Sequence, residues 1–420
     1  MAGLSTVSTG APKTGQIFLY FSALTLVVYL IAPQGYLVDI ATSYMLKNQL
    51  HAAANQVAMY RLVTAVPVYA GFVFGLTRDL WNPFGLRDRG FLLIFAPLAA
   101  AAFLWMAFSR LSYIGLFAGL LLAMGSFQFS MAAYQGLITL IGQEDLMTGR
   151  LSTLWNVFSF IPYVVSAFAS GFIAEHLSPH QAFLMMAVLA VVLAGLGLLK
   201  PRAVFSHAYD KPQARGTNFV GDVKRLVKHK AIYPAILINF LSNFMPGSST
   251  PLQFYLTNQL KASDSSFSYF TGIFLASFIP MFLLYGFLCK RVALNKLLWW
   301  GTMILVPQMI PLAFIHSAKA ALLMAAPMGM MGGMATVMYI DLAMRSCPAG
   351  LQGTLMMLVF GGWALSLRGS DVFGAWLYNS SPVHGFLYCV IATTIVYALI
   401  LPLILLVPKE LTATADGEAL

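Results

Sequence analysis

The sequence predicts an all-α integral membrane protein with twelve transmembrane helices in two six-helix repeats. Of its 420 residues, 59% are apolar and only 9% are charged, whereas an ordinary soluble domain has about 25% charged residues. The apolar runs are about 20 residues long, which is the length of a transmembrane helix rather than of a barrel strand. Motifs of the first half of the chain also return in the second half. Together these observations exclude a soluble fold and leave no room for a separate soluble domain.

A polar segment at residues 200–230 divides six predicted helices from six. It holds eight basic and two acidic residues. The chain is therefore predicted to consist of an N-terminal half (1–199), a cytoplasmic linker (200–230) and a C-terminal half (231–420). The twelve helices are predicted at residues 17–43, 54–77, 89–108, 112–140, 150–174, 180–199, 231–258, 266–288, 297–316, 319–343, 353–377 and 383–407.

The distribution of basic residues predicts the orientation of the chain in the membrane. Of the 24 Lys and Arg residues, 18 fall on the side that holds both termini and the linker, four fall on the other side, and Arg61 and Arg368 lie within helices. Basic loops remain in the cytoplasm. We therefore expect a multi-pass protein of the cell (inner) membrane with both termini cytoplasmic. The net charge of +10 is explained by basic residues in cytoplasmic loops and by their contact with lipid headgroups. We therefore expect no nucleic-acid partner.

Matches between the halves recur in the same order. Residues 46–50 (LKNQL) return as residues 256–260 (LTNQL), and Pro67 in the second helix matches Pro280 in the eighth. Late in each half, Gly171 matches Gly374 at an offset of 203. Two halves with the same topology are typically related by an axis along the membrane normal.

The loop after the second helix carries a candidate cytoplasmic gate. Gly75 and Arg78-Asp79 precede a five-residue insertion, and Arg87 and Arg89 follow it. This loop resembles the signature between helices 2 and 3 of the major facilitator superfamily. An Asp at this helix end can pair with Arg and face the positive N-terminus of a helix from the other half. The alternative is an ordinary charged turn.

Charged residues within helices are costly in lipid and are therefore candidates for transport or gating. Asp39 and Arg61 lie at similar depth on helices 1 and 2. Arg368 and Asp371 are three residues apart on helix 11, so they share a face and can pair. Asp341 lies four residues before Arg345 near the inner end of helix 10. These two residues can form a structural ion pair or can be part of the gate. Structural pairing is the alternative for the other four residues as well.

Uncharged polar residues accompany these charges. Helix 7 is broken at residues 246–251 (PGSSTP), and the backbone groups freed there require a cavity or a partner. An individual amide within a membrane more often joins helices than binds a solute, and a single aromatic residue there is usually packing. The amide candidates for solute contact are Gln34, Gln128, Asn239 and Asn243, and Gln135, Asn156 and Gln308 belong to the same class.

Several kinds of chemistry are missing from the sequence. It has no phosphate-binding GxxxxGK[ST] motif, no HExxH motif and no Asp-rich loop, and its three cysteines have no metal spacing. We therefore expect no cofactor, no metal and no enzymatic activity.

Two segments of the second half resemble the folate–biopterin transporter family. They are residues 243–260 (NFMPGSSTPLQFYLTNQL) and residues 346–355 (SCPAGLQGTL), the latter with Gln352 where that family tends to have an acid. The first half is similar more loosely, through Pro33 and Tyr36. The resemblance implies proton-coupled import of a folate, a pterin or a similar compound.

We therefore expect a monomeric secondary transporter that works by alternating access. Arg61 or Arg368 would meet the carboxylate of an organic anion, and Asp39 or Asp371 would exchange the proton. The alternative within transporters is another solute, such as a siderophore, a peptidoglycan fragment or a drug. Outside transporters, the alternatives are a non-transporting receptor and a membrane enzyme.

Overall fold

The computed structural model describes residues 10–32, 38, 42, 45–46, 50–51, 60, 63–205 and 219–418. Within these ranges the chain is mostly helical and has no β-strand. Runs rich in Leu, Ala and Met favour helix, and in lipid a helix satisfies its own backbone hydrogen bonds. The prediction of an all-α fold is confirmed.

The first half contains the helices predicted as 1 to 6. The first helix begins at residue 10 rather than at residue 17, and most of residues 33–62 lie outside the described residues. The described elements of this half are α1 (Gly10–Ile31), α4 (Val66–Tyr69), α5 (Gly71–Leu80), η2 (Pro83–Gly85), α6 (Asp88–Phe108), α7 (Tyr113–Glu144), α8 (Thr148–His176) and α9 (Pro179–Leu198).

The second half contains the helices predicted as 7 to 12, four of which are interrupted. Its elements are α12 (Ile232–Asn243), α13 (Ser249–Phe254) and η3 (Tyr255–Gln259) for helix 7, α14 (Asp264–Ala276) and α15 (Phe278–Leu288) for helix 8, α16 (Leu294–Leu305) and η4 (Ile310–Phe314) for helix 9, α17 (Ala318–Arg345) for helix 10, α18 (Gln352–Asn379) for helix 11, and α19 (Gly385–Ala398) and α20 (Ile400–Ile404) for helix 12.

Two short helices lie outside these spans. In the polar segment between the halves, α11 (Phe219–Lys228) buries Asp222, which pairs with Arg225 at 3.2 Å. Arg225 also donates to the carbonyl of Ala349, just before α18, at 3.1 Å. Through this bond α11 is attached to the second half, whereas Phe205, before α11, packs against Tyr20 of the first half. After α20, a further helix, α21 (Lys409–Thr412), begins the C-terminal segment.

Eight described helices are long and apolar enough to cross a membrane, judged by length and composition. They include α6, α7, α9 and α17. The fully described α18 is not among them, because Arg368 and Asp371 lie within it. The chain is a multi-pass membrane protein.

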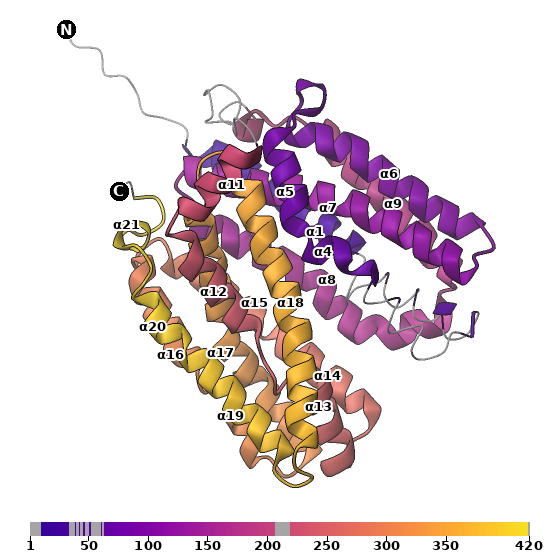
Figure 1. Cartoon of the computed structure of the whole chain (residues 1–420), viewed down its shortest axis with the longest axis vertical. Coiled ribbons are helices and arrows are strands. Elements are labelled where there is room, and N and C mark those ends of the chain that lie inside the picture. Colours follow the sequence, from indigo (N-terminus) through magenta and orange to yellow (C-terminus); the bar gives the residue numbers. More distant parts are fainter. Residues whose placement is uncertain are drawn as a thin grey trace.

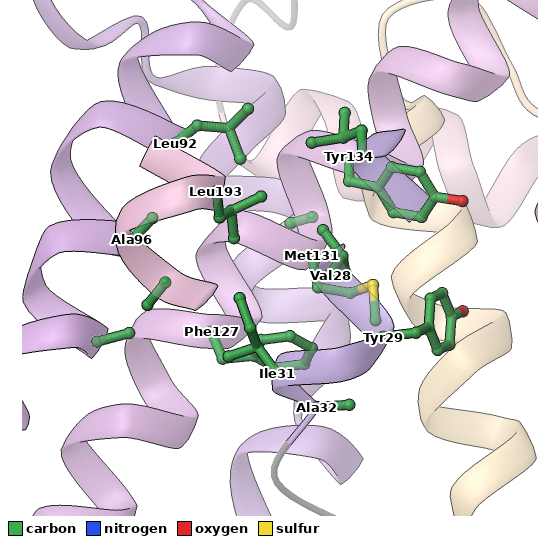
Figure 2. Close-up of a cluster of buried hydrophobic side chains, with 14 of the residues drawn as sticks. Val28, Tyr29, Ile31, Ala32, Leu92, Ala96, Phe127, Met131, Tyr134 and Leu193 are labelled. Atoms are coloured by element: carbon green, nitrogen blue, oxygen red, sulfur yellow. The ribbon is translucent and has the colours of Figure 1, made fainter. Parts of the chain in front are cut away.

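The core of the first half is formed by α1, α6, α7 and α9, which pack together in pairs. Figure 2 shows its apolar side chains, including Val28 of α1, Leu92 of α6 and Leu193 of α9. The hydroxyl groups of Tyr29 and Tyr134 both point to one side, away from this cluster. The core thus fixes two polar groups on the inner face of the half.

The two halves lie side by side, and the C-terminus, α21 and α11 gather at one end of the bundle (Figure 1). We call this the basal end. α5, α9 and α17 finish at this end, and α8 and α18 begin there. The candidate site residues fall into a basal group and a group further along α7, α12 and α18.

Candidate functional site

At the basal end, the end of α5 is joined to the start of α18 by hydrogen bonds. The Asp79 carboxylate accepts from the backbone N–H groups of Gly353 at 3.2 Å and Thr354 at 2.7 Å, and from the Thr354 hydroxyl at 2.6 Å. The first N–H groups of a helix lack partners within the helix, and the helix dipole favours negative charge there. Asp79 was expected to face the start of a helix from the other half. That helix is α18.

Arg78 lies between two carboxylates. Its Nη1 donates to Asp79 at 2.7 Å and its Nε donates to Asp88 at 2.5 Å, with only 9% of its side chain exposed. A buried charge is tolerated when it is paired and hydrogen-bonded. The group has one more carboxylate than cations, and the start of α18 faces that extra charge.

Three glycines allow this close packing. A β-carbon at Gly75 would collide with the Gly353 carbonyl, and one at Gly136 of α7 would collide with the Arg78 guanidinium. A β-carbon at Gly353 would lie 2.9 Å from the Asp79 carboxylate. Any side chain at these positions would separate α5 from α18 or displace Arg78, which explains the glycine at the first position of the loop motif.

The ion pair expected between Asp341 and Arg345 is present at the end of α17. The Nε of Arg345 lies 3.0 Å from the carboxylate, and Tyr285 of α15 donates to the same carboxylate at 2.5 Å. The Nε of Arg345 also donates to the Thr148 hydroxyl at the start of α8, at 3.2 Å. The pair is therefore structural and also reaches the other half.

Two basal contacts were not anticipated from the sequence. Gln143 of α7 donates to the carbonyls of Met344 and Cys347, both at 2.8 Å. Asp416 accepts from the backbone N–H of Gly149 at 3.0 Å and from the Nε of Arg150 at 2.7 Å. A single polar residue near a helix end or a chain end gives no pattern that would have identified either contact.

The environment of Asp416 opposes its ionisation. Burial raises the pKa of the Asp416 carboxyl, and the nearby Asp341 carboxylate acts in the same direction. The hydrogen bond and the charge of Arg150 oppose this shift.

The other two arginines of the loop motif make different contacts. Arg89 donates to the carbonyls of Gly197 and Leu198 at the end of α9, at 3.0 and 2.9 Å. A cation at a helix C-terminus is stabilised by the last carbonyls, so Arg89 ties α6 to α9 within the first half. The backbone N–H of Arg87 donates to the Asn82 side chain at 2.7 Å and shapes the loop itself.

Away from the basal end, Asp371 of α18 is bound to the restart of helix 7. It accepts from the Thr250 backbone N–H at 3.0 Å and from the Thr250 hydroxyl at 3.1 Å. The backbone N–H of Gly247, within the break, donates to the Thr393 hydroxyl of α19 at 3.1 Å. The groups freed by the break therefore have partners on α18 and α19.

The structural pair that the spacing of Arg368 and Asp371 allowed as an alternative does not form. Both residues are described, but no ion pair joins them, because Asp371 is already bound to Thr250. The Arg368 side chain is exposed, and no hydrogen bond or ion pair within the described part of the chain involves it. Its guanidinium lies within electrostatic range of Tyr163 of α8, in the other half.

The amide candidates fall into two groups. Asn239 donates to the carbonyls of Ala235 and Tyr339 at 2.9 and 3.1 Å, and Asn243 donates to the carbonyl of Asn239 at 2.8 Å. These two residues join helices or cap their own turns.

On α7, by contrast, the side-chain amide of Gln135 is fully buried without a hydrogen-bond partner among the described residues. The same holds for the carbonyl oxygen of Gln128 and the hydroxyl of Thr139. The spacing of seven and four residues places these three side chains on one face of α7. Buried polar groups normally have partners, so these three side chains form a buried polar stripe on α7.

Aromatic side chains next to this stripe are hydrogen-bonded. Trp155 of α8 donates to the Tyr29 hydroxyl at 2.8 Å, and Tyr134 is bonded to Thr25 at 2.8 Å. These bonds connect α1 to α8 and α1 to α7 through the two hydroxyl groups seen in Figure 2.

Three candidate residues, Gln34, Asp39 and Arg61, lie outside the described residues. Among the residues that the structure does describe, no group of three or more His, Cys, Asp or Glu side chains could hold a metal ion.

Comparison with known proteins identifies a family. Residues 17–367 match the family model of the Major Facilitator Superfamily. The chain is 22% identical over 334 residues to the folate-biopterin transporter of Synechocystis sp., covering 76% of this chain and 67% of that protein. It is 23% identical over 307 residues to folate transporter 1 of Plasmodium falciparum, covering 67% of this chain and 56% of that protein.

Solved structures show the same fold. The fucose:proton symporter FucP of E. coli matches with a TM-score of 0.68 and 15% identity, covering 93% of this chain and 98% of that one. The human organic anion transporter MFSD10 matches with a TM-score of 0.64 and 13% identity, covering 94% of this chain and 100% of that one. The expectation of twelve helices in two repeats is confirmed.

Proposed function

Because the chain belongs to the Major Facilitator Superfamily, we propose that it moves a folate- or pterin-like organic anion across the membrane, coupled to protons, by alternating access. The observation that carries the anion assignment is Arg368, an exposed cation in the middle of α18 with no partner within the described chain. A guanidinium binds a carboxylate through two parallel hydrogen bonds. The two folate transporters that resemble the chain support the same substrate class.

Asp371 is the proposed proton carrier. Its carboxylate holds the restart of helix 7 through Thr250. Protonation weakens hydrogen bonds that a carboxylate accepts, and would thereby loosen α13 from α18 while the solute is bound beside Arg368. Gln128 of α7, Asn239 and Asn243 are further candidates for solute contact, together with Gln34, Asp39 and Arg61.

The basal contacts form the proposed gate. Gly75, Arg78 and Asp79 hold α5 against α18, and Asp341 with Arg345 holds α17 against α8. Opening the basal end requires these contacts to break. Arg87 shapes the loop that carries the gate through its backbone N–H, and Arg89 ties the following helix, α6, to α9.

We place the basal end in the cytoplasm and both termini with it, in the cell (inner) membrane, with the halves at 1–199 and 231–420 moving around the linker at 200–230. The basic residues of the loops at this end support the orientation. A monomer with one solute path suffices for this mechanism.

Uptake into proteoliposomes tests the proposal. Radiolabelled folate and a pterin without the glutamate moiety are each offered with and without an imposed pH gradient, and a neutral sugar is the control solute. We expect accumulation of a folate or a pterin that disappears with a protonophore. Absence of uptake of both compounds by folded protein contradicts the substrate class, and uptake without dependence on the gradient contradicts the proton coupling.

A further inference from the structure

The start of α8 is bound by a carboxylate in the same way as the start of α18. Asp416 accepts from the backbone N–H groups of Gly149 at 3.0 Å and Arg150 at 3.3 Å. At α18, Asp79 accepts from the corresponding N–H groups of Gly353 and Thr354. The two pairs of donors are 204 residues apart, close to the offset of 203 between the later parts of the same two helices. They are equivalent positions of the repeat.

The two carboxylates are not equivalent positions. Asp79 ends helix 2, and offsets of 210 to 213 lead from it to residues 289–292 (CKRV) at the end of helix 8. No acid is present in that segment. Cys289 occupies the corresponding space, because a β-carbon at Gly149 would lie 2.9 Å from the Cys289 β-carbon. The second half thus lacks the acid of its own loop.

The C-terminal segment is positioned to supply that acid. The backbone N–H of Asp416 donates to the Cys289 carbonyl at 2.8 Å, which places the Asp416 carboxylate directly beside the residue that replaces the missing acid. Arg345 donates to the carbonyls of Leu411 and Thr414 at 3.3 and 3.0 Å. Only 1% of the Asp416 side chain is exposed. Several bonds hold the segment, so it is an ordered part of the basal end.

We propose that residues 409–418 form a strap that replaces the missing gate carboxylate and holds the basal end closed. The strap follows α20 of the second half, whereas its carboxylate binds α8 of the first half. The contact must break whenever the basal ends of the halves separate. The strap therefore favours the state in which the basal ends of the two halves are together. This inference rests on the alternating access proposed above.

Native cysteines provide the test. Cys289 and Cys347 are buried at the basal end, whereas Cys389 is buried in α19 and packs against Gly374 of α18. The rate of alkylation by a maleimide is measured for each cysteine by mass spectrometry in the full chain, in Asp416→Asn and in a chain ending at residue 408. We expect Cys289 and Cys347 to react roughly twofold to thirtyfold faster in both variants, the range that corresponds to a lost helix cap, with Cys389 unchanged.

Matched controls separate the possible causes. Glu410→Gln removes an exposed acid of the same segment and should leave all three rates unchanged. Cys289→Asp in the truncated chain puts the acid at the position equivalent to Asp79 and should restore slow reaction of Cys347. Faster reaction of Cys289 alone shows local release of the segment without opening, and overturns the strap.

The outcome can be distinguished from failure of the proposed function, because the assay needs no substrate. The gate on the α5 side is tested with Asp79→Asn, for which the alkylation rate of Cys347 is measured in the same way. If Asp79→Asn accelerates Cys347 but Asp416→Asn does not, the strap is overturned and the gate stands. If Asp416→Asn accelerates Cys347 but no folate or pterin is taken up, the strap stands and the substrate class fails.

Discussion

Asp371 of α18 holds Thr250 through both its backbone N–H and its hydroxyl, so a single carboxylate fixes the point at which helix 7 restarts. Asp371→Ala should leave these half-buried groups without their partner, at a cost below the about 1–3 kcal/mol of a fully buried unsatisfied donor. We expect a lower Tm in detergent, and a smaller decrease for Asp371→Asn, whose amide oxygen can still accept. A wild-type Tm for Asp371→Ala would contradict this role.

Removing Arg368 should affect transport and not stability. Its guanidinium has no hydrogen bond or ion pair within the described chain, so Arg368→Gln removes no structural contact recorded there. Loss of a charged hydrogen-bonding group typically costs about 1.5–3 kcal/mol of binding, which corresponds to a KM roughly tenfold or more higher. Uptake kinetics and Tm are measured together. A lower Tm with unchanged KM would show instead that Arg368 is structural.

The gate contact at Asp79 is expected to matter more than a surface ion pair. Asp79→Asn weakens a buried, charge-assisted contact with the start of α18 and should lower transport more than expression. Asp145→Asn is the control, because Asp145 pairs with Lys13 at 3.7 Å and is 22% exposed, and such pairs contribute little. Equal transport by the two variants would show that the charged residues of the loop set only the orientation of the chain in the membrane.

Glycine at position 75 is required by packing. In Gly75→Ala the new methyl group would collide with the Gly353 carbonyl, and we expect faster alkylation of Cys347 together with reduced transport. Gly362→Ala in α18 is the control, since a β-carbon there meets nothing within 4 Å and Ala favours helix. Similar behaviour of the two variants would show that the close approach of α5 to α18 is dispensable.

The orientation is tested with single cysteines at two exposed lysines. Lys290 lies at the basal end, and Lys319 lies near the opposite end of α17 from Arg345. An impermeant maleimide applied to intact cells should label Lys319→Cys and should reach Lys290→Cys only after permeabilisation. Labelling of both from the same side would refute the topology.

Local sequence patterns predicted the basal contact on the α5 side well. A glycine, an Asp and an Arg at a helix end define both the close approach and the charge, and only the identity of the receiving helix was missing. The lengths of α7 and α8 were also predicted within a few residues, because their apolar runs are continuous.

Contacts between distant segments were not predictable in this way. The spacing of Arg368 and Asp371 permits a pair on one helix face, but the break in helix 7 frees a backbone donor, Thr250, that binds the carboxylate. For Asp416 the only signal was negative: the segment after helix 8 lacks an acid. The partner then came from the far end of the chain, which no spacing rule reveals.

The charges of α18 have a consequence for membrane insertion. A helix with Arg368 and Asp371 near its middle is poorly retained by lipid on its own, and α18 is not among the eight helices apolar enough to span alone. Of its neighbours, α5, α7, α12 and α13 precede it in the chain and α19 follows it, so Thr250 of α13 is synthesised before Asp371. The break in helix 7 therefore prepares a binding partner for a later helix, and biogenesis of the second half depends on helices 7 and 11 assembling together in the bilayer.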